Sequence, residues 1–244
     1  MTLEAPYIAK NAKPGQFIQV RCSNGLDPLL RRPFSIHRLK AQGSRLKGIE
    51  ILYEVLGKGT ELLAGKKKGE SLNVLGPLGN GFTMPSAFSL QPSAILVAGG
   101  IGVAPLIFLA EKLKEIRIMV LLGARTKNLI LCEKDFKKAT PEVYVSTDDG
   151  TYGSQGFVSK LFHKILKTTE SKFETIVYVC GPHGMLKCIA DICQERKFKC
   201  QVSLEEKMAC GIGVCLGCAV KTKSGTKLAC KDGPIFNASE LIWP

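Results

Sequence analysis

Four cysteines near the end of the chain carry the strongest chemical signal in the sequence. Cys210, Cys215, Cys218 and Cys230 follow the order C-x4-C-x2-C-x11-C. Three cysteines in a short loop, followed by a distant fourth, are typical of the ligands of a plant-type [2Fe–2S] cluster. Glycines stand between these cysteines, and glycine lets backbone N–H groups approach the thiolate sulfurs without a Cβ in the way. The pattern predicts a [2Fe–2S] site.

Zinc is the main alternative metal that the same cysteines could bind. Structural zinc sites usually combine two CxxC-like pairs. This segment instead has one CxxC, one wider spacing and a single outlying cysteine. The spacing favours the cluster. A zinc-bound binding module without turnover, and cysteines with no ligand role, stay open as alternatives.

A second candidate site lies at Arg32, Pro33, Phe34 and Ser35, at the start of a predicted strand. Arginine presents a planar fork of donors that matches phosphate oxygens, and the aromatic and hydroxyl groups beside it can flank a flavin ring. Downstream, the Gly59-Thr60 pair lies where a short helix is expected, and a helix start offers backbone N–H groups to phosphates. The alternative is a basic edge strand in which Pro33 prevents aggregation.

Two further loops suit a dinucleotide. Gly100 and Gly102 lie in GGIGVAP, which follows a predicted strand and opens a predicted helix. The third position of the common G-x-G-x-x-G motif is proline here, so a tight turn is the alternative. Cys180 and Gly181 end another predicted strand. Ligands of open α/β sheets bind at this edge, so we expect Cys180 to contact a nicotinamide as the candidate catalytic residue, with Gly181 binding the cofactor; a simply buried cysteine is the alternative.

The elements that must position these residues change character along the chain. Residues 1–88 show short alternating strands with turn signals, which predict a small antiparallel β-barrel. Residues 92–200 alternate continuous apolar strands with helices, which predicts a parallel α/β domain buried on both faces. Residues 201–244 form the segment that carries the cluster loop. The expected fold class is therefore α+β and α/β multidomain.

The individual elements follow from the same patterns. In the first domain we expect strands at 16–22, 33–39, 48–56 and 71–75, with a polar separator at 41–47 and a short helix ending at Ala64. In the second we expect strands at 94–98, 117–123, 142–146 and 175–180, and helices at 105–116, 129–139, 156–167 and 183–197.

Composition excludes several other classes of protein. The net charge of +13 suggests nucleic acid, but the basic residues are scattered and aromatic residues make up only 7%. A basic surface for an acidic partner or for phosphate-bearing cofactors explains the charge equally well. The most apolar stretch, 95–109, is short and interrupted by glycine and proline, so no membrane span is expected. Ten cysteines without a secretory signal indicate a reducing compartment, and we expect the cytoplasm.

Taken in order, RRPFS, GKGT, GGIGVAP, VCGPHGM and the cysteine loop resemble the ferredoxin-reductase-like flavoproteins. More narrowly, the chain resembles the electron-transfer subunits of B-type dihydroorotate dehydrogenases. The resemblance covers nearly the whole chain, and its most specific part is a cluster loop preceded by Glu-x-x-Met. It implies that four cysteines hold the cluster and that FAD is bound by Arg32, Pro33, Phe34, Ser35, Leu52, Tyr53, Glu54, Gly59 and Thr60.

The resemblance also implies a function. The family's subunit takes electrons from the FMN of a catalytic subunit and passes them through [2Fe–2S] and FAD to NAD⁺, in the synthesis of the pyrimidine UMP. It implies a heterotetramer with two of each subunit. A subunit of an NAD(P)H:ferredoxin or sulfide-type oxidoreductase is the alternative. The family begins with a β-strand before the segment matching 3–16, so the barrel is expected to be one strand short or the start to lie upstream.

Overall fold

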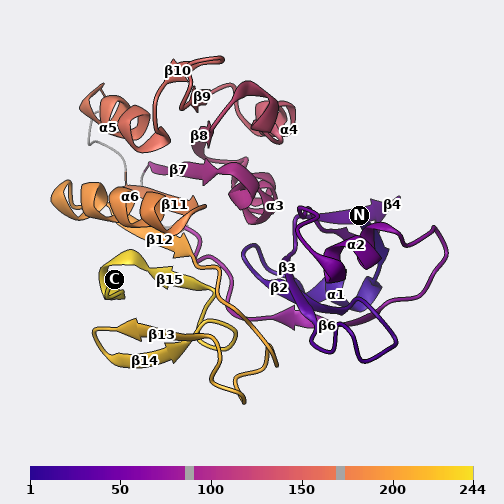
Figure 1. The fold of residues 1–244 in the computed structure, drawn as a ribbon. Coiled ribbons are helices and arrows are strands. Elements are labelled where there is room, and N and C mark those ends of the chain that lie inside the picture. Colours follow the sequence, from indigo (N-terminus) through magenta and orange to yellow (C-terminus); the bar gives the residue numbers. More distant parts are fainter. Residues whose placement is uncertain (86–90, 169–173, 244) are drawn as a thin grey trace.

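A computed structural model describes residues 1–85, 91–168 and 174–243 of the chain. Figure 1 shows three regions: an N-terminal region of short strands, a central α/β region, and a C-terminal region that lies against both of the others. No helix within the described ranges is long and apolar enough to cross a membrane.

The N-terminal region contains two three-stranded antiparallel sheets. One has the order β1 (Thr2–Glu4), β5 (Arg45–Glu50) and β4 (Arg38–Gln42), and the other has the order β3 (Arg32–Ser35), β2 (Phe17–Arg21) and β6 (Asn73–Leu78). Helices α1 (Pro6–Asn11) and α2 (Lys58–Ala64) accompany them. The core between them contains Ile18, Val20, Ile36, Ile49 and Leu63. The antiparallel β structure is confirmed, and the closed barrel stays a prediction.

Four of the expected N-terminal elements differ from the prediction, and the strand expected at 71–75 is shifted to Asn73–Leu78. The strand expected at 33–39 is divided, because β3 ends at Ser35 and β4 begins at Arg38. The strand expected at 48–56 ends at Glu50, and Leu52, Tyr53 and Glu54 instead face a cavity. The polar stretch 41–47 is not a separator: it contains the paired ends of β4 and β5 and the turn at 43–44 that joins them, where Gly43 takes the positive φ of +60° that a tight turn needs.

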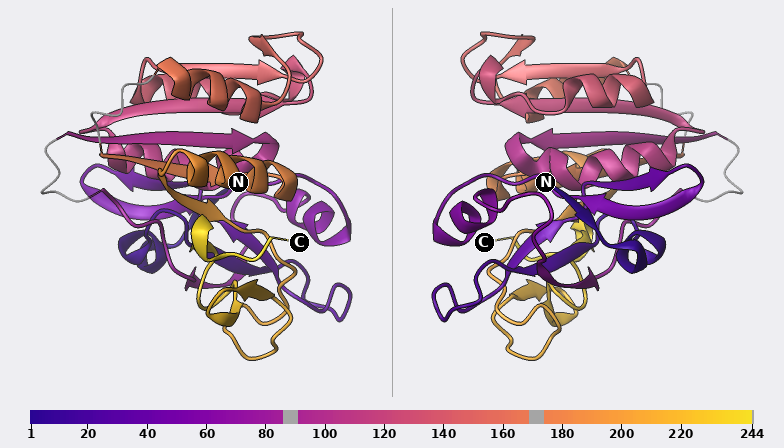
Figure 2. Two further views of the ribbon diagram at one scale, coloured as in Figure 1. Left: turned by 90° about the vertical axis from the view of Figure 1, so that its left-hand side faces the viewer. Right: turned by 90° about the vertical axis from the view of Figure 1, so that its right-hand side faces the viewer.

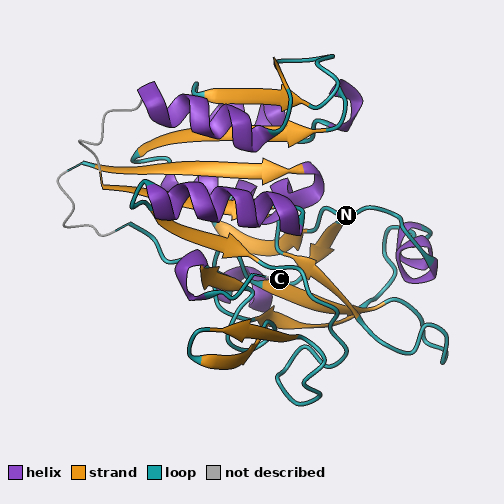
Figure 3. Ribbon diagram, turned by 60° about the vertical axis from the view of Figure 1, so that its left-hand side comes forward, coloured by secondary structure: helices purple, strands orange, loops and turns teal. Residues whose placement is uncertain are grey.

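The central region is a parallel sheet with helices on both faces (Figure 3). The sheet order is β10 (Ser154–Gln155), β9 (Val143–Thr147), β8 (Arg117–Ala124), β7 (Pro92–Gly99), β11 (Glu174–Cys180), β12 (Lys199–Ser203) and β15 (Ile235–Asn237). Helices α5 (Val158–Thr168) and α6 (His183–Glu195) cover one face, and α3 (Val103–Leu113) and α4 (Glu133–Ala139) cover the other.

Burial on both faces explains the continuous apolar strands of this region. In β7, Ile95 and Val97 pack with α5 and α6, whereas Leu96 and Ala98 pack with α3 and α4. The predicted parallel α/β sheet is confirmed. One helix differs, because α4 begins at Glu133 rather than at residue 129; Cys132 before it takes a left-handed φ of 59°, which an α-helix cannot continue through.

The C-terminal region is built onto this sheet. Strand β15 pairs antiparallel with the sixth strand, β12, and neither strand was among those expected from the sequence. In the chain segment that connects β12 to β15, β13 (Ala219–Thr222) and β14 (Gly225–Leu228) form a hairpin. The side views in Figure 2 place this hairpin at the far end of the molecule from β9 and β10. A bridge between Asn80 and Pro234 ties the same region to the N-terminal strands.

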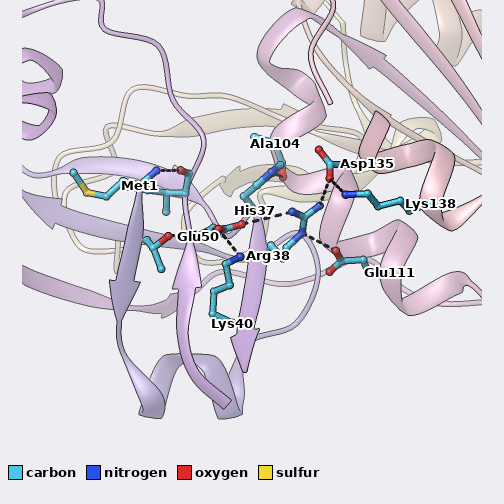
Figure 4. Close-up of polar contacts among 11 residues, drawn as sticks. Met1, His37, Arg38, Lys40, Glu50, Ala104, Glu111, Asp135 and Lys138 are labelled. Carbon is cyan, nitrogen blue, oxygen red and sulfur yellow. Dashed lines mark hydrogen bonds and ion pairs between the residues drawn. The ribbon is translucent and has the colours of Figure 1, made fainter. Parts of the chain in front are cut away.

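Polar contacts join the N-terminal strands to the helices of the central region (Figure 4). The Nδ1 of His37 lies 2.8 Å from the carbonyl oxygen of Ala104 in α3. Arg38 forms ion pairs with Glu111 of α3 at 2.6 Å and Asp135 of α4 at 3.3 Å. These contacts fix the strands against the helices, and the cavity described next lies at the same junction, since Ala104 is also part of its wall.

Candidate functional site

A cavity of about 310 Å³ lies where the three regions meet. The residues of the N-terminal region that line it are Phe17, Arg32, Pro33, Phe34, Ser35, Leu52, Tyr53, Glu54, Leu56 and Thr60. Those of the central region are Ile101, Ala104, Pro105, Cys180 and Ser203, and those of the C-terminal region are Leu204, Glu205, Glu206, Met208 and Pro234. The structure therefore brings most of the predicted flavin residues together with Cys180, although they come from distant parts of the chain.

Arg32 is held at this cavity by its own loop. Its Nη1 donates to the carbonyl oxygen of Leu30 at 2.8 Å. Gly59 leaves room for it, because a Cβ at Gly59 would lie 3.1 Å from Arg32 Nε. Gly59 thus contacts Arg32 but does not itself line the cavity. Thr60, which does line the cavity, fixes the start of α2, since its Oγ1 accepts the backbone N–H of Gly57 at 3.2 Å.

The aromatic side of the cavity is formed by Phe34 and Tyr53. Their ring centroids lie 5.2 Å apart with a tilt of 53°. Burial raises the pKa of the Tyr53 phenol, so it stays protonated at neutral pH. Together the rings give one wall an apolar, planar character suited to a flat heteroaromatic ring.

The two glycine loops meet at the carboxyl edge of the parallel sheet. A Cβ at Gly102 would lie 2.2 Å from the carbonyl oxygen of Cys180, so only glycine allows the loops to approach this closely. Gly181 is similarly enclosed, because a Cβ there would lie 2.6 Å from Met185 Cε. Gly100, in contrast, has a φ of +54° and open space where a Cβ would be. Gly102 and Gly181 therefore shape the edge, and Gly100 leaves it accessible.

Cys180 is a neutral thiol in this structure. It is buried, and this burial, with the nearby Glu205 carboxylate adding to it, raises its pKa to about 12. The nearby Ser203 side chain partly opposes this rise in the pKa. A thiol that stays protonated is a poor nucleophile, so its chemistry here is limited to packing and hydrogen bonding.

Six residues that follow β11 in the chain also line the cavity and were not predicted as site residues: Ser203, Leu204, Glu205, Glu206, Met208 and Pro234. Burial in the wall, together with the neighbouring Glu54, raises the pKa of Glu205. The Glu-x-x-Met pattern marked this stretch only as a family feature. The rule that ligands bind at the carboxyl ends of parallel strands would have found Ser203, had β12 been recognised as a strand.

The four cysteines of the cluster loop lie in two pairs. Cys210 lies beside Cys215, and Cys218 lies beside Cys230. Cys210 Sγ accepts backbone N–H groups from Ile212, Val214 and Cys215 at 3.4 to 3.5 Å. These donors lower the pKa of Cys210 to about 6, because they stabilise its thiolate.

The fourth cysteine, Cys230, is held by the same loop. The N–H of Gly213 donates to Cys230 Sγ at 3.1 Å, and the N–H of Cys230 donates to Cys218 Sγ at 3.4 Å. Across the described residues, no group of three or more His, Cys, Asp or Glu side chains is arranged to hold a single metal ion. Two thiol pairs surrounded by N–H donors match a two-iron group, in which four cysteines serve two metals.

Family models match two parts of the chain. Residues 205–242, which include all four cysteines, match the iron-sulfur cluster binding domain of dihydroorotate dehydrogenase B. Residues 96–191, which include both glycine loops, match the oxidoreductase NAD-binding domain.

Full-length relatives agree with these matches. The chain is 45% identical to the dihydroorotate dehydrogenase B (NAD⁺) electron transfer subunit of Desulforamulus reducens, over 100% of this chain and 92% of that protein. It is 38% identical to the subunit of the same name from Geobacillus kaustophilus, over 99% of this chain and 91% of that protein. The chain belongs to this family. The resemblance stated from the motifs is confirmed.

Solved structures extend the comparison to the fold. An NADH-dependent reduced ferredoxin-NADP oxidoreductase is 32% identical with a TM-score of 0.84, over 99% of this chain and 84% of that one. The ferredoxin-NADP⁺ reductase of Plasmodium falciparum is 15% identical with a TM-score of 0.60, over 82% of this chain and 87% of that one, and shows the fold alone. The family member described here therefore has the ferredoxin-reductase-like fold, with an NAD-binding domain and an iron-sulfur segment.

Proposed function

We propose that this chain is the electron-transfer subunit of a dihydroorotate dehydrogenase B, linking the oxidation of dihydroorotate on a catalytic partner to the reduction of NAD⁺ in UMP synthesis. The observation that carries the proposal is that one cavity touches the flavin motif, the nicotinamide edge and the segment leading to the cluster cysteines. When bound, a [2Fe–2S] cluster carries single electrons, while FAD exchanges one or two and so matches hydride transfer to NAD⁺.

The N-terminal region is proposed to hold FAD. Arg32 supplies the charged donor for the pyrophosphate, and Phe34 and Tyr53 supply an apolar wall. Pro33, Ser35, Leu52, Glu54 and Thr60 complete the cavity, with Gly59 supporting Arg32. The two antiparallel sheets support a barrel of the kind that the family resemblance implies.

The central region is proposed to bind NAD at the edge of its sheet. Gly100 leaves space for the dinucleotide backbone, and Gly102 and Gly181 keep the two loops close together. Cys180 lies in the cavity wall beside Ser203, and its neutral thiol is suited to pack against a nicotinamide without reacting with it.

A partner subunit with FMN is proposed to cover the cluster loop. Ile212, Val214 and Leu216 stand between the ligand cysteines and are exposed. Apolar side chains gathered at a functional loop are typical of a docking surface. A heterotetramer with two of each subunit is the proposed assembly. The ten free cysteines support a cytoplasmic location, where thiols stay reduced.

The direct test is dihydroorotate-dependent reduction of NAD⁺, followed at 340 nm. We expect this chain alone to oxidise NADH with an artificial acceptor but to show no activity with dihydroorotate, and the mixture with its catalytic subunit to reduce NAD⁺. Substantial dihydroorotate oxidation by the isolated chain would contradict the division of labour. Failure of a mixture fully loaded with cofactors would contradict the proposed partner.

A second candidate is a subunit of an NAD(P)H:ferredoxin oxidoreductase. The observation in its favour is the 0.84 TM-score and 32% identity to the NADH-dependent reduced ferredoxin-NADP oxidoreductase. The 45% identity to an electron transfer subunit of dihydroorotate dehydrogenase B favours the first candidate. Reduction of ferredoxin by NADH, in a complex that does not oxidise dihydroorotate, would identify the second.

A further inference from the structure

Gln19 is a buried polar residue that the flavin and nicotinamide sites do not use. It lies in the middle of β2 with no exposed surface. Among the residues that the structure describes, neither its Nε2 nor its Oε1 has a hydrogen-bond partner. Buried amides are nearly always paired, so an unpaired one inside a sheet calls for a partner that the chain itself does not supply.

The strand directs this side chain away from the core of the N-terminal region. Alternate residues of a strand point to opposite faces, and Ile18 and Val20 pack into the N-terminal core. Gln19 therefore shares the other face with Phe17. Phe17 belongs to the same buried cluster as Cys218 and Cys230, and it also lines the cavity.

On this face Gln19 touches the cluster loop. A Cβ built at Gly211 would lie 2.6 Å from Gln19 Cγ and 2.8 Å from its Nε2, so the amide occupies the space where residue 211 would carry a side chain. Gly211 directly follows the ligand Cys210 and has a φ of +73°. Both the conformation and the contact require glycine at this position.

The same residue also borders the flavin cavity. In the sheet Gln19 pairs with Pro33 of β3, which is part of the cavity wall. Cross-strand partners are only about 5 Å apart at Cβ. Gln19 thus lies between the proposed flavin site and the cluster loop.

We propose that the Gln19 amide donates a hydrogen bond to the sulfur atoms of the [2Fe–2S] cluster and thereby raises its reduction potential. This inference rests on the cluster of the proposed function. The sulfides and thiolates of such a cluster are acceptors only, and a glutamine amide provides two N–H donors in either of its two orientations. Hydrogen bonds to the sulfurs stabilise the reduced, more negative cluster and so raise its potential.

The test is a redox titration of the purified full-length chain, with the reduced cluster followed by electron paramagnetic resonance. We expect Gln19→Leu to lower the potential, so that at a fixed ambient potential the ratio of reduced to oxidised cluster falls about tenfold, or ~59 mV. The resonance positions should shift as well. Gln201→Leu is the matched control, because Gln201 is also buried but is paired at both ends with Thr83.

A second variant covers the case in which Gln19→Leu loses the cluster. Gln19→Glu keeps the shape, and a carboxyl group beside the cluster should make the potential fall with rising pH more steeply than in the wild type. Unchanged potential and resonances in Gln19→Leu, no added pH dependence in Gln19→Glu, or an equal shift in Gln201→Leu would each overturn the inference. A wild-type chain without any [2Fe–2S] signal would instead refute the cluster of the proposed function.

Discussion

Arg31 and Arg32 are neighbours in sequence with different surroundings. Arg31 turns to β6, where its Nη1 and Nη2 donate to the backbone and side-chain oxygens of Asn73 at 2.9 and 2.7 Å. Arg32 lines the cavity, and among the described residues its hydrogen bonds go to carbonyl oxygens of its own loop, at Leu30 and Arg31. The direction of its side chain decides whether an arginine can contact a cofactor. The RRPFS motif alone does not reveal these directions.

We expect Arg32→Ala to weaken FAD binding by about 1.5–3 kcal/mol, because it removes a charge-assisted contact with the pyrophosphate. The dissociation constant can be measured from the quenching of flavin fluorescence. Arg31→Ala is the matched control and should leave FAD binding nearly unchanged. Equal weakening by both substitutions would show that the positive charge acts without specific contact.

The cluster ligands allow an equally local prediction. Cys215→Ser should remove or destabilise the cluster while most of the FAD is retained, because the flavin cavity is lined by residues of other segments. Iron content and the visible spectrum of the purified variant provide the measurement. Cys188→Ser, at an exposed cysteine in α6, is the control and should keep both cofactors. Full iron content in Cys215→Ser would refute the ligand assignment.

At the scale of elements, the central sheet was predictable because its strands are apolar on both faces. Three strands of this sheet escaped prediction: β10, which has two residues, and β12 and β15, whose residues also carry polar side chains such as Gln201 and Ser203. The alternation of β2 placed Gln19 on the polar face, which would be solvated in an isolated sheet. The cluster loop covers that face instead, and such tertiary burial has no signature in local sequence.

The candidate site was predictable only in part for the same reason. The cluster cysteines and the flavin motif are short, spaced patterns, so their chemistry could be read directly. Glu205 and Met208 enter the cavity because the chain returns from β12 past the flavin wall. A path of this kind is set by packing between regions, and propensity or periodicity does not reveal it.

The junction of β3, β4 and α3 makes stability depend on pH. His37 lies at this junction, buried, and its Nδ1 must carry a hydrogen to donate to the Ala104 carbonyl. Burial lowers its pKa below 6.5, and Arg38 lowers it further, while the hydrogen bond to Ala104 and the carboxylates of Glu50 and Glu111 oppose the shift. The folded protein therefore disfavours protonated His37 relative to the unfolded chain.

The sign of the effect follows from this shift. Because the folded pKa lies below the unfolded one, stability from neutral His37 is complete above about pH 6.5 and is lost as pH falls from there toward the folded pKa. We expect the thermal midpoint to decrease as the pH is lowered from about 7.5 to about 5.5. The decrease should be less steep in His37→Gln, because glutamine keeps a hydrogen-bond donor but does not titrate. His163→Gln, at an exposed helical residue, should leave the slope unchanged. Identical slopes in the wild type and His37→Gln would contradict this account.

At the scale of the whole molecule, three regions converge so that each cofactor site borders the next. The flavin cavity touches the nicotinamide edge at Cys180 and the cluster segment at Met208. The ion pairs of Arg38 and the extension of the sheet by β15 fix this arrangement from two sides. The proposed cofactor sites would thus form an internal route from the cluster loop to the sheet edge, and the end of this route that faces solvent is the exposed apolar loop of Ile212, Val214 and Leu216.

Leu216 is the sharpest probe of that open end. It is 65% exposed and adopts a positive φ of 58°, a conformation that costs leucine more than asparagine. An exposed leucine in an unfavourable conformation between Cys215 and Cys218 fits the proposed burial of this loop against a partner. We expect Leu216→Asn to weaken binding to the catalytic subunit roughly tenfold to a hundredfold, the loss of about 1.5–3 kcal/mol of apolar burial, while the iron content stays unchanged.

Titration calorimetry of the two cofactor-loaded subunits measures the affinity. Phe157→Asn, at a residue 69% exposed beside α5, is the matched control and should bind like the wild type. If Leu216→Asn binds as tightly as the wild type, the partner docks on another face of the molecule.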